Sequence, residues 1–255
     1  MRNTWTICRK ELGSYFVSWI AYILLTLFAA AFGFFFWTLL TVFVVEGMEM
    51  QMRGQAFPMN LNEQIIRPLL MNVSVIGLFM IPLITMRLFA EEKRNGTIEL
   101  LATSPVLDLE IILGKWLAAL ILYSSLLLLT GLNLAFLFKF GHPDWKPLAV
   151  AYLGLLLQAG ALLAIGTFIS TLTRNQIIAG AATFVVCLLL YVFGWVEGFE
   201  SSTWAHVLAY TSVATHFDSF VRGVIDLKDA VFYLTVIILG LFFTSRSMES
   251  LRWRS

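Results

Sequence analysis

Six long stretches of this chain are almost wholly apolar, and no charged residue lies near the middle of any of them. A helix needs about 20 apolar residues to cross a hydrocarbon core of roughly 30 Å. In lipid, every backbone N–H and C=O must be paired within its own segment, so these stretches should be helices. The pattern therefore predicts an all-α integral membrane protein with six transmembrane helices. The predicted spans are residues 20–45, 69–86, 116–138, 148–172, 177–196 and 230–245.

Residues 1–19 predict a separate amphipathic helix. Drawn as a helix, this segment gathers its large apolar side chains on one face, with Arg9 and Lys10 off that face. The apolar set is Trp5, Cys8, Leu12, Tyr15, Phe16 and Trp19. Such a helix suits the cytoplasmic membrane surface; the alternative is that it extends the first span inward. A cleaved secretory signal is disfavoured, because the apolar run continues to Val45, well beyond the 7–15 residues of a signal core.

The composition leaves little room for a separate soluble domain. Of 255 residues, 59% are hydrophobic and 13% charged, against about 25% charged in a soluble domain. We therefore treat residues 1–255 as a single membrane domain. The net charge of +1 gives no reason to propose nucleic acid as a partner. Cys8 lies before the first span and Cys187 inside the fifth, so both indicate packing rather than a disulfide framework.

The interiors of the spans offer few groups for proton or ion relays. Carriers driven by ion gradients usually keep ionisable residues inside the membrane, whereas the strongly polar residues here are Asn133 and Gln158. These two could line a substrate path. They could equally hydrogen-bond between helices, which is the commoner role for such groups in membranes. The energy for any movement is therefore expected to come from another chain.

The distribution of Lys and Arg predicts that both termini are cytoplasmic. With that orientation, eleven of the 17 basic residues fall inside and six outside, as the positive-inside rule requires. The inside set is Arg2, Arg9, Lys10, Arg87, Lys93, Arg94, Lys115, Arg174, Arg246, Arg252 and Arg254. The weak point is the last stretch, which is about 16 residues long and could dip into the membrane without crossing it.

The segment between the second and third spans has the most informative pattern. Residues 87–94 can continue the second span as a helix, and Asn95-Gly96 supplies a helix stop that tolerates positive φ. Thr97 is a good N-cap for a short helix over 98–103, and Ser104-Pro105 can begin the next helix. A short helix held crosswise between two spans could pass a push from a soluble partner to the membrane helices. The alternative is an ordinary solvated loop.

This segment carries a family resemblance. The stretch RLFAEEKRNGTIELL at residues 87–101, followed by Ser104-Pro105, resembles the cytoplasmic loop of ABC-2 type transporter permeases. RKEL at 9–12 is similar to their entry helix, and HFDSFVRGVID at 216–226 resembles the segment before their last span. SWIAY at 18–22 and SLRW at 250–253 are closest to the gliding-motility F-subunit branch.

The resemblance implies a permease subunit in a bacterial plasma membrane. Its implied partners are a nucleotide-binding ATPase subunit, a second permease copy or related membrane subunit, and the lipid bilayer. The implied ATPase-coupling residues are Glu91, Glu92, Lys93, Arg94, Gly96, Thr97, Glu99 and Leu100.

ATP and Mg²⁺ are expected on the partner, because this chain lacks a phosphate loop. Gly114-Lys115 is followed by Trp116 rather than by Ser or Thr, with no glycine at the required spacing. His142, His206 and His216 form no metal-ligand motif, so we expect no metal, cofactor or catalytic residue here.

Two other classes of protein remain as alternatives. One is a membrane scaffold for motility or envelope assembly that moves no solute. The other is an intramembrane enzyme, which the scarcity of buried acids and bases disfavours.

Overall fold

The computed structural model describes residues 2–54, 60–98, 106–141, 143–198 and 203–252. Within these ranges the regular structure is helical, with no strand. The helices are α1 (Arg2–Val17), α2 (Trp19–Met52), α3 (Arg67–Thr85), α4 (Ala90–Asn95), α6 (Asp108–Gly141), α7 (Trp145–Leu172), α8 (Gln176–Val192), α9 (Thr203–Tyr210), α10 (Val213–Val221) and α11 (Leu227–Arg252). A π-helical turn, Asn62–Ile66, leads into α3, and a 3₁₀ turn, Phe193–Gly198, follows α8.

Six helical segments of the described chain are long and apolar enough to cross a membrane, which confirms the predicted all-α fold class. They correspond to α2, a segment Asn62–Asn95 that contains α3 and α4, and then α6, α7, α8 and α11. The last segment covers Leu227–Ser250, 24 residues. At 1.5 Å per residue this is about 36 Å, enough for a full crossing. The apparent shortness of the sixth apolar stretch therefore reflects polar ends on a longer helix.

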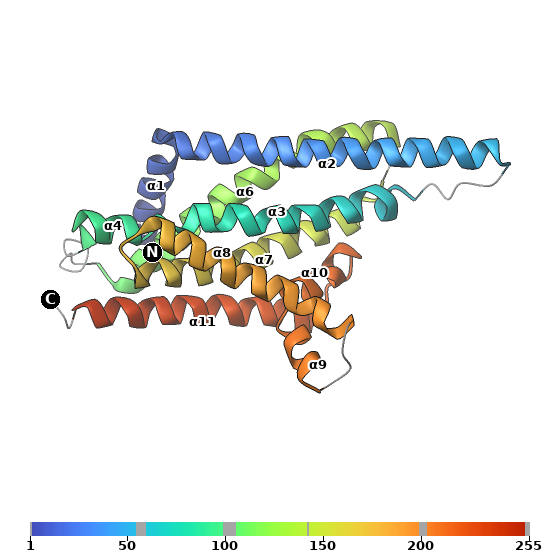
Figure 1. Ribbon diagram of the computed structural model, residues 1–255. Helices are drawn as coiled ribbons and strands as arrows, with labels where there is room; N and C mark the ends of the chain where they lie inside the picture. Colours follow the sequence, from blue (N-terminus) through green and yellow to red (C-terminus); the bar gives the residue numbers. More distant parts are fainter. Residues whose placement is uncertain (1, 55–59, 99–105, 142, 199–202, 253–255) are drawn as a thin grey trace.

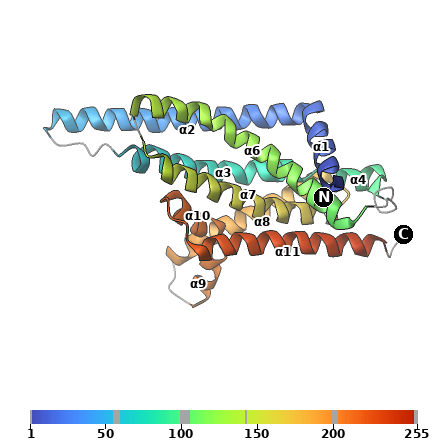
Figure 2. The same ribbon diagram turned by 180° about the vertical axis from the view of Figure 1, so that it is seen from behind.

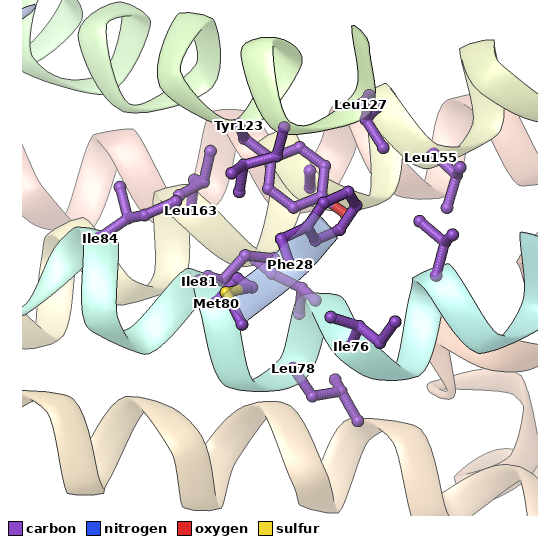
Figure 3. Packing of buried hydrophobic residues seen from close by; sticks show 14 of the residues in the cluster. Phe28, Ile76, Leu78, Met80, Ile81, Ile84, Tyr123, Leu127, Leu155 and Leu163 are labelled. Carbon is purple, nitrogen blue, oxygen red and sulfur yellow. The ribbon is translucent and has the colours of Figure 1, made fainter. Parts of the chain in front are cut away.

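The long helices lie side by side, with α2 and α11 at opposite edges and α7 between them (Figures 1 and 2). The interior is filled by fully buried side chains such as Phe28 of α2, Ile81 of α3, Tyr123 of α6 and Leu163 of α7 (Figure 3). Close backbone approach needs small residues. A Cβ at Gly166 of α7 would lie 2.4 Å from the Thr85 hydroxyl oxygen, so glycine fixes the α3–α7 contact there.

Helix α1 is a separate element that crosses the ends of the spans (Figure 1). The chain turns at Ser18, which is extended and whose hydroxyl accepts a hydrogen bond from the Ile20 N–H at 3.4 Å. This turn rules out the alternative that the segment extends the first span. The apolar face is divided: Cys8 and Tyr15 are buried, whereas Trp5 is 61% and Trp19 82% exposed. One part of the face packs on the protein and the other is free to contact lipid.

Helices α9 and α10, between α8 and α11 in sequence, lie near the ends of those two helices that are remote from α1 and α4, and α2 extends beyond them (Figure 1). Phe217 and Phe220 of α10 pack on α7 at Gly154, where an added Cβ would lie 2.5 Å from Phe220. The long segment after the fifth span therefore contains two short helices. They leave α1 and α4 together at the other end, where the candidate site lies.

Candidate functional site

Helix α4 is separated from α3 by a turn. Helix α3 ends at Thr85, residues 86–89 form the turn, and α4 begins at Ala90. Residues 87–94 therefore do continue the second span, within the segment Asn62–Asn95, but a turn at 86–89 interrupts the helix. Leu88 and Phe89 are buried in the turn, and the burial of these apolar side chains redirects the chain.

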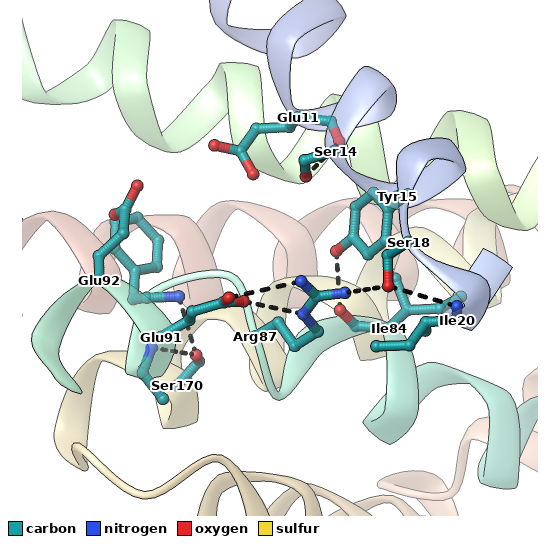
Figure 4. Close-up of polar contacts among 12 residues, drawn as sticks. Glu11, Ser14, Tyr15, Ser18, Ile20, Ile84, Arg87, Glu91, Glu92 and Ser170 are labelled. Carbon is teal, nitrogen blue, oxygen red and sulfur yellow. Dashed lines mark hydrogen bonds and ion pairs between the residues drawn. The ribbon is translucent and has the colours of Figure 1, made fainter. Parts of the chain in front are cut away.

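The start of α4 is fixed to α7. The buried Ser170 hydroxyl oxygen accepts hydrogen bonds from the backbone N–H groups of Phe89, at 3.0 Å, and Ala90, at 3.1 Å (Figure 4). The first N–H groups of a helix have no partner within it. Ser170 therefore performs the role of an N-cap from a different helix.

The end of α4 is the predicted glycine stop. Gly96 has φ 71°, and its N–H bonds to the Glu92 carbonyl oxygen, as does the Thr97 N–H at 3.0 Å. A left-handed residue that closes the last turn in this way is a common helix end. The predicted positive φ is confirmed. The predicted short helix over 98–103, with Glu99 and Leu100, lies largely outside the described residues.

Glu91 ties α4 to the junction of α1 and α2. Its carboxylate accepts from Arg87, with oxygen–nitrogen distances of 2.8 and 3.4 Å, and Arg87 also reaches the Ser18 hydroxyl at 3.5 Å (Figure 4). The Tyr15 hydroxyl donates to the Ile84 carbonyl at 2.8 Å. Two polar contacts therefore join the α1 end of the chain to the segment that carries α4.

Glu92 points inward to a buried lysine. The Lys115 ammonium, on α6, lies 2.9 Å from a Glu92 oxygen and 2.9 Å from a Glu11 oxygen on α1. It also lies over the Phe89 ring, 5.2 Å from the centroid. The Lys115 side chain is only 2% exposed. One ammonium thus joins α1, α4 and α6, and we call Glu11, Glu92 and Lys115 the buried triad.

The triad holds one carboxylate more than it has ammonium groups. Burial raises the pKa of Glu92, the Lys115 charge opposes that shift, and the nearby Glu11 carboxylate adds to it. An open polar cavity of about 450 Å³ adjoins the triad, between α1, α4 and α6. Its lining includes Lys10, Glu11, Ser14, Arg87, Glu92, Asn95, Thr97 and Lys115.

Lys93 and Arg94 do not join the triad. Lys93 donates to the Thr171 carbonyl oxygen at the end of α7. Burial, with a smaller effect from the Arg174 charge, lowers the pKa of Lys93. Arg94, Asn95, Gly96 and Thr97 are exposed. The expected coupling residues therefore divide: Glu91 and Glu92 pair with cations of this chain, Lys93 bonds to the end of α7, and Arg94 is exposed.

Sequence reasoning missed the triad, although it noted Lys115 as a residue that fails to complete a phosphate loop. A lysine at the start of an apolar helix needs a carboxylate partner if it is buried. That requirement is the available signal, since Glu11 and Glu92 are among the acids predicted on the same membrane face. The sequence separation of 104 between Lys115 and Glu11 hides the contact from any local pattern.

The two polar residues within the spans have different surroundings. Gln158 of α7 is buried; its amide nitrogen donates to the Ser74 hydroxyl oxygen at 2.7 Å, and its amide oxygen lies 3.0 Å from the same hydroxyl. This is a hydrogen bond between α3 and α7, the arrangement that a structural role requires. Asn133 is half-buried on α6.

No group of three or more His, Cys, Asp or Glu side chains is placed to hold a metal ion among the residues with described positions. His216 instead pairs with Asp229 at 2.7 Å, both buried between α10 and α11. His142 lies outside the described ranges.

The fold and this end of the bundle define a multi-pass helical membrane protein with a short helix, α4, at the end of its second candidate span. The family model described as ABC-2 family transporter protein matches residues 49–244, well over half of the chain. The chain belongs to the ABC-2 transporter family. No curated protein gives a significant match to it.

Proposed function

We propose that this chain is the permease subunit of an ATP-driven transporter, and that a separate nucleotide-binding subunit hydrolyses ATP and moves the spans through α4. Family membership supports the permease class. The observation that carries the coupling role is the attachment of α4 to three other helices: to α7 through Ser170, to α6 and α1 through Lys115, and to the α1–α2 junction through Arg87.

These attachments favour transmission of a displacement over local yielding. A loop with few contacts would absorb a push by changing its own conformation, because weakly bonded segments open at little free-energy cost. Moving α4 as a body would instead carry the α3 turn, the start of α6 and the end of α7. Each of these belongs to a predicted span or continues into one. The ordinary solvated loop is therefore the weaker alternative.

The outer surfaces of the bundle support assembly with a second membrane chain. In the most apolar window of α7, 56% of residues are buried within this chain, against 22% in α2 and 17% in α8. An apolar groove of about 490 Å³ lies between α3 and α8, lined by Phe79, Leu83, Ile177 and Phe184 among others. We propose that a second copy, or a related chain, covers part of this surface and that lipid covers the rest.

The proposed setting is the bacterial plasma membrane, with both termini and α4 in the cytoplasm. ATP and Mg²⁺ would bind the partner, and this chain would supply no catalytic residue. A role in gliding motility rests on two short similarities, SWIAY and SLRW, and stays a prediction. A scaffold that transmits motion without moving solute is the remaining alternative.

The test is purification of the tagged chain from its native membranes in mild detergent, with mass spectrometry of the chains that remain bound. We expect a soluble chain with a phosphate loop and Mg²⁺-dependent ATP hydrolysis by the complex. Reconstituted vesicles would then be assayed with candidate solutes. A complex that hydrolyses ATP but moves none of them would favour the scaffold; a tagged chain that never binds an ATPase would contradict the proposal.

A further inference from the structure

The acidic and basic side chains of α4 differ in whether they have an ion-pair partner within the chain. Glu91 faces Arg87 and Glu92 faces Lys115, so both acids have a cationic partner within the chain. Lys93 and Arg94 follow them directly in sequence; Lys93 is half-buried and bonds to the end of α7, and Arg94 is exposed. The charges of α4 that lack an ion-pair partner in the described chain are therefore both basic, although the sequence of the helix is evenly mixed.

A third cation extends this basic surface. Arg174, in the turn between α7 and α8, is exposed and close enough to Lys93 to lower its pKa. Lys93 bonds to the Thr171 carbonyl oxygen, a neutral acceptor. Across the described part of the chain, none of the three has a carboxylate within ion-pairing distance. We call Lys93, Arg94 and Arg174 the basic corner.

Like charges gathered without a counter-ion repel one another, and the repulsion is relieved when an anionic group binds. The anion could belong to a soluble protein or to lipid headgroups. The position of the corner favours the protein. The exposed tryptophans Trp5 and Trp19 on and beside α1 suit the membrane–water interface. Along the direction of the spans, α4 lies beyond α1, near the level of the end of α11 (Figures 1 and 2).

We propose that an acidic surface of the ATPase subunit docks on the basic corner, with Lys93, Arg94 and Arg174 as its cationic contacts. This rests on the function proposed above and specifies the charge of the partner. The family resemblance implied that Glu92 is an ATPase-coupling residue. In this proposal Glu92 instead belongs to the internal triad and not to the docking surface.

Zero-length crosslinking tests the contact directly. A carbodiimide joins a primary amine to a carboxylate that touches it, so Arg94→Lys places a reactive amine at the exposed centre of the corner. Arg9→Lys, on an exposed position of α1, is the matched control. In the purified complex we expect amide links from position 94 to Asp or Glu of the ATPase, identified by mass spectrometry. An assembled complex in which position 94 gives no such link overturns the inference.

Charge reversal separates the protein partner from lipid. The complex is placed in phosphatidylcholine nanodiscs, and ATPase affinity is measured for wild type, the double variant Arg94→Glu/Arg174→Glu, and Arg9→Glu. We expect about a tenfold or greater loss for the double variant and a change within about twofold for Arg9→Glu. Equal losses in both variants would show a general effect of charge rather than a contact at the corner, and a loss that requires added phosphatidylglycerol would assign the corner to anionic headgroups; either result overturns the inference.

The two proposals fail in different ways. If wild-type and double-variant chains bind the ATPase equally and hydrolyse ATP, the proposed function stands and the basic corner is not its contact. If no ATPase with a phosphate loop binds the wild-type chain, both proposals fall.

Discussion

The ammonium of Lys115 lies 2.9 Å from Glu92, which joins the start of α6 to a six-residue helix on the other side of a loop. Lys115 is almost fully buried, so neither charge is well solvated, and Glu11 occupies its other side at 2.9 Å. A buried ion pair adds little net stability compared with apolar packing, but breaking it leaves an uncompensated charge. The triad therefore fixes where α1, α4 and α6 meet.

Replacing Lys115 should destabilise the protein strongly. Lys115→Met would leave Glu11 and Glu92 facing each other without a counter-ion, at a cost of about 3 kcal/mol or more. Thermal unfolding of the detergent-purified chain measures the loss, and Lys139→Met, at the exposed far end of the same helix, is the matched control. The double variant Lys115→Met/Glu92→Gln should recover part of the loss. Independent, additive effects of the two changes would mean that they do not form a pair.

Removing the Ser170 hydroxyl should loosen the start of α4 without unfolding the spans. Ser170→Ala leaves the N–H groups of Phe89 and Ala90 without an acceptor, at about 1–3 kcal/mol for a buried donor. Hydrogen exchange at residues 89–95 should become faster. Thr167→Val is the control on the same helix, because the Thr167 hydroxyl bonds only to Leu163 in its own helix. Unchanged exchange in Ser170→Ala would show that other contacts hold α4.

The fold could be predicted from the sequence, because an apolar segment long enough to cross a bilayer can satisfy its backbone hydrogen bonds only as a helix or within a closed barrel. The Gly96 stop was equally accessible, since Asn-Gly after a charged helix predicts a left-handed residue. The turn at 86–89 was not, because Leu88 and Phe89 are apolar residues that fit a continuing helix until the neighbouring helices are known. The triad could not be predicted for the same reason. Helical periodicity identifies the apolar and polar faces of each helix but does not say which helices pack against each other.

Gly96 should tolerate β-branched residues poorly. A Cβ there meets no other atom within 4 Å, so any cost comes from its φ of 71°, and Gly96→Val should cost roughly 1–2 kcal/mol. We expect the chain to insert normally but to bind the ATPase more weakly. Gly13→Val is the matched change, in a helix and also without close neighbours. Equal ATPase binding by both variants would argue against a role for the shape of the α4 end.

Cysteine labelling tests the orientation. Cys8 and Cys187 are buried, so single introduced cysteines at Gly54 and Asn95, both exposed, should dominate the signal. A membrane-impermeant maleimide added to intact cells should label Gly54→Cys and leave Asn95→Cys unreacted until the membrane is opened. Labelling of Asn95→Cys in sealed cells would place α4 outside and remove the basis for coupling to a cytoplasmic ATPase.

The central claim is that the ATPase subunit contacts the α4 end, and protection of a thiol at Asn95 tests it most directly. The rate of maleimide labelling of Asn95→Cys is measured in detergent with and without the bound ATPase subunit, with Gly54→Cys as the reference at the opposite end. We predict that the ATPase slows labelling at Asn95 by about tenfold or more, which corresponds to about 1.4 kcal/mol of free energy. The labelling rate at Gly54 should not change. Equal labelling rates at Asn95 in the free chain and in an active complex would contradict the account.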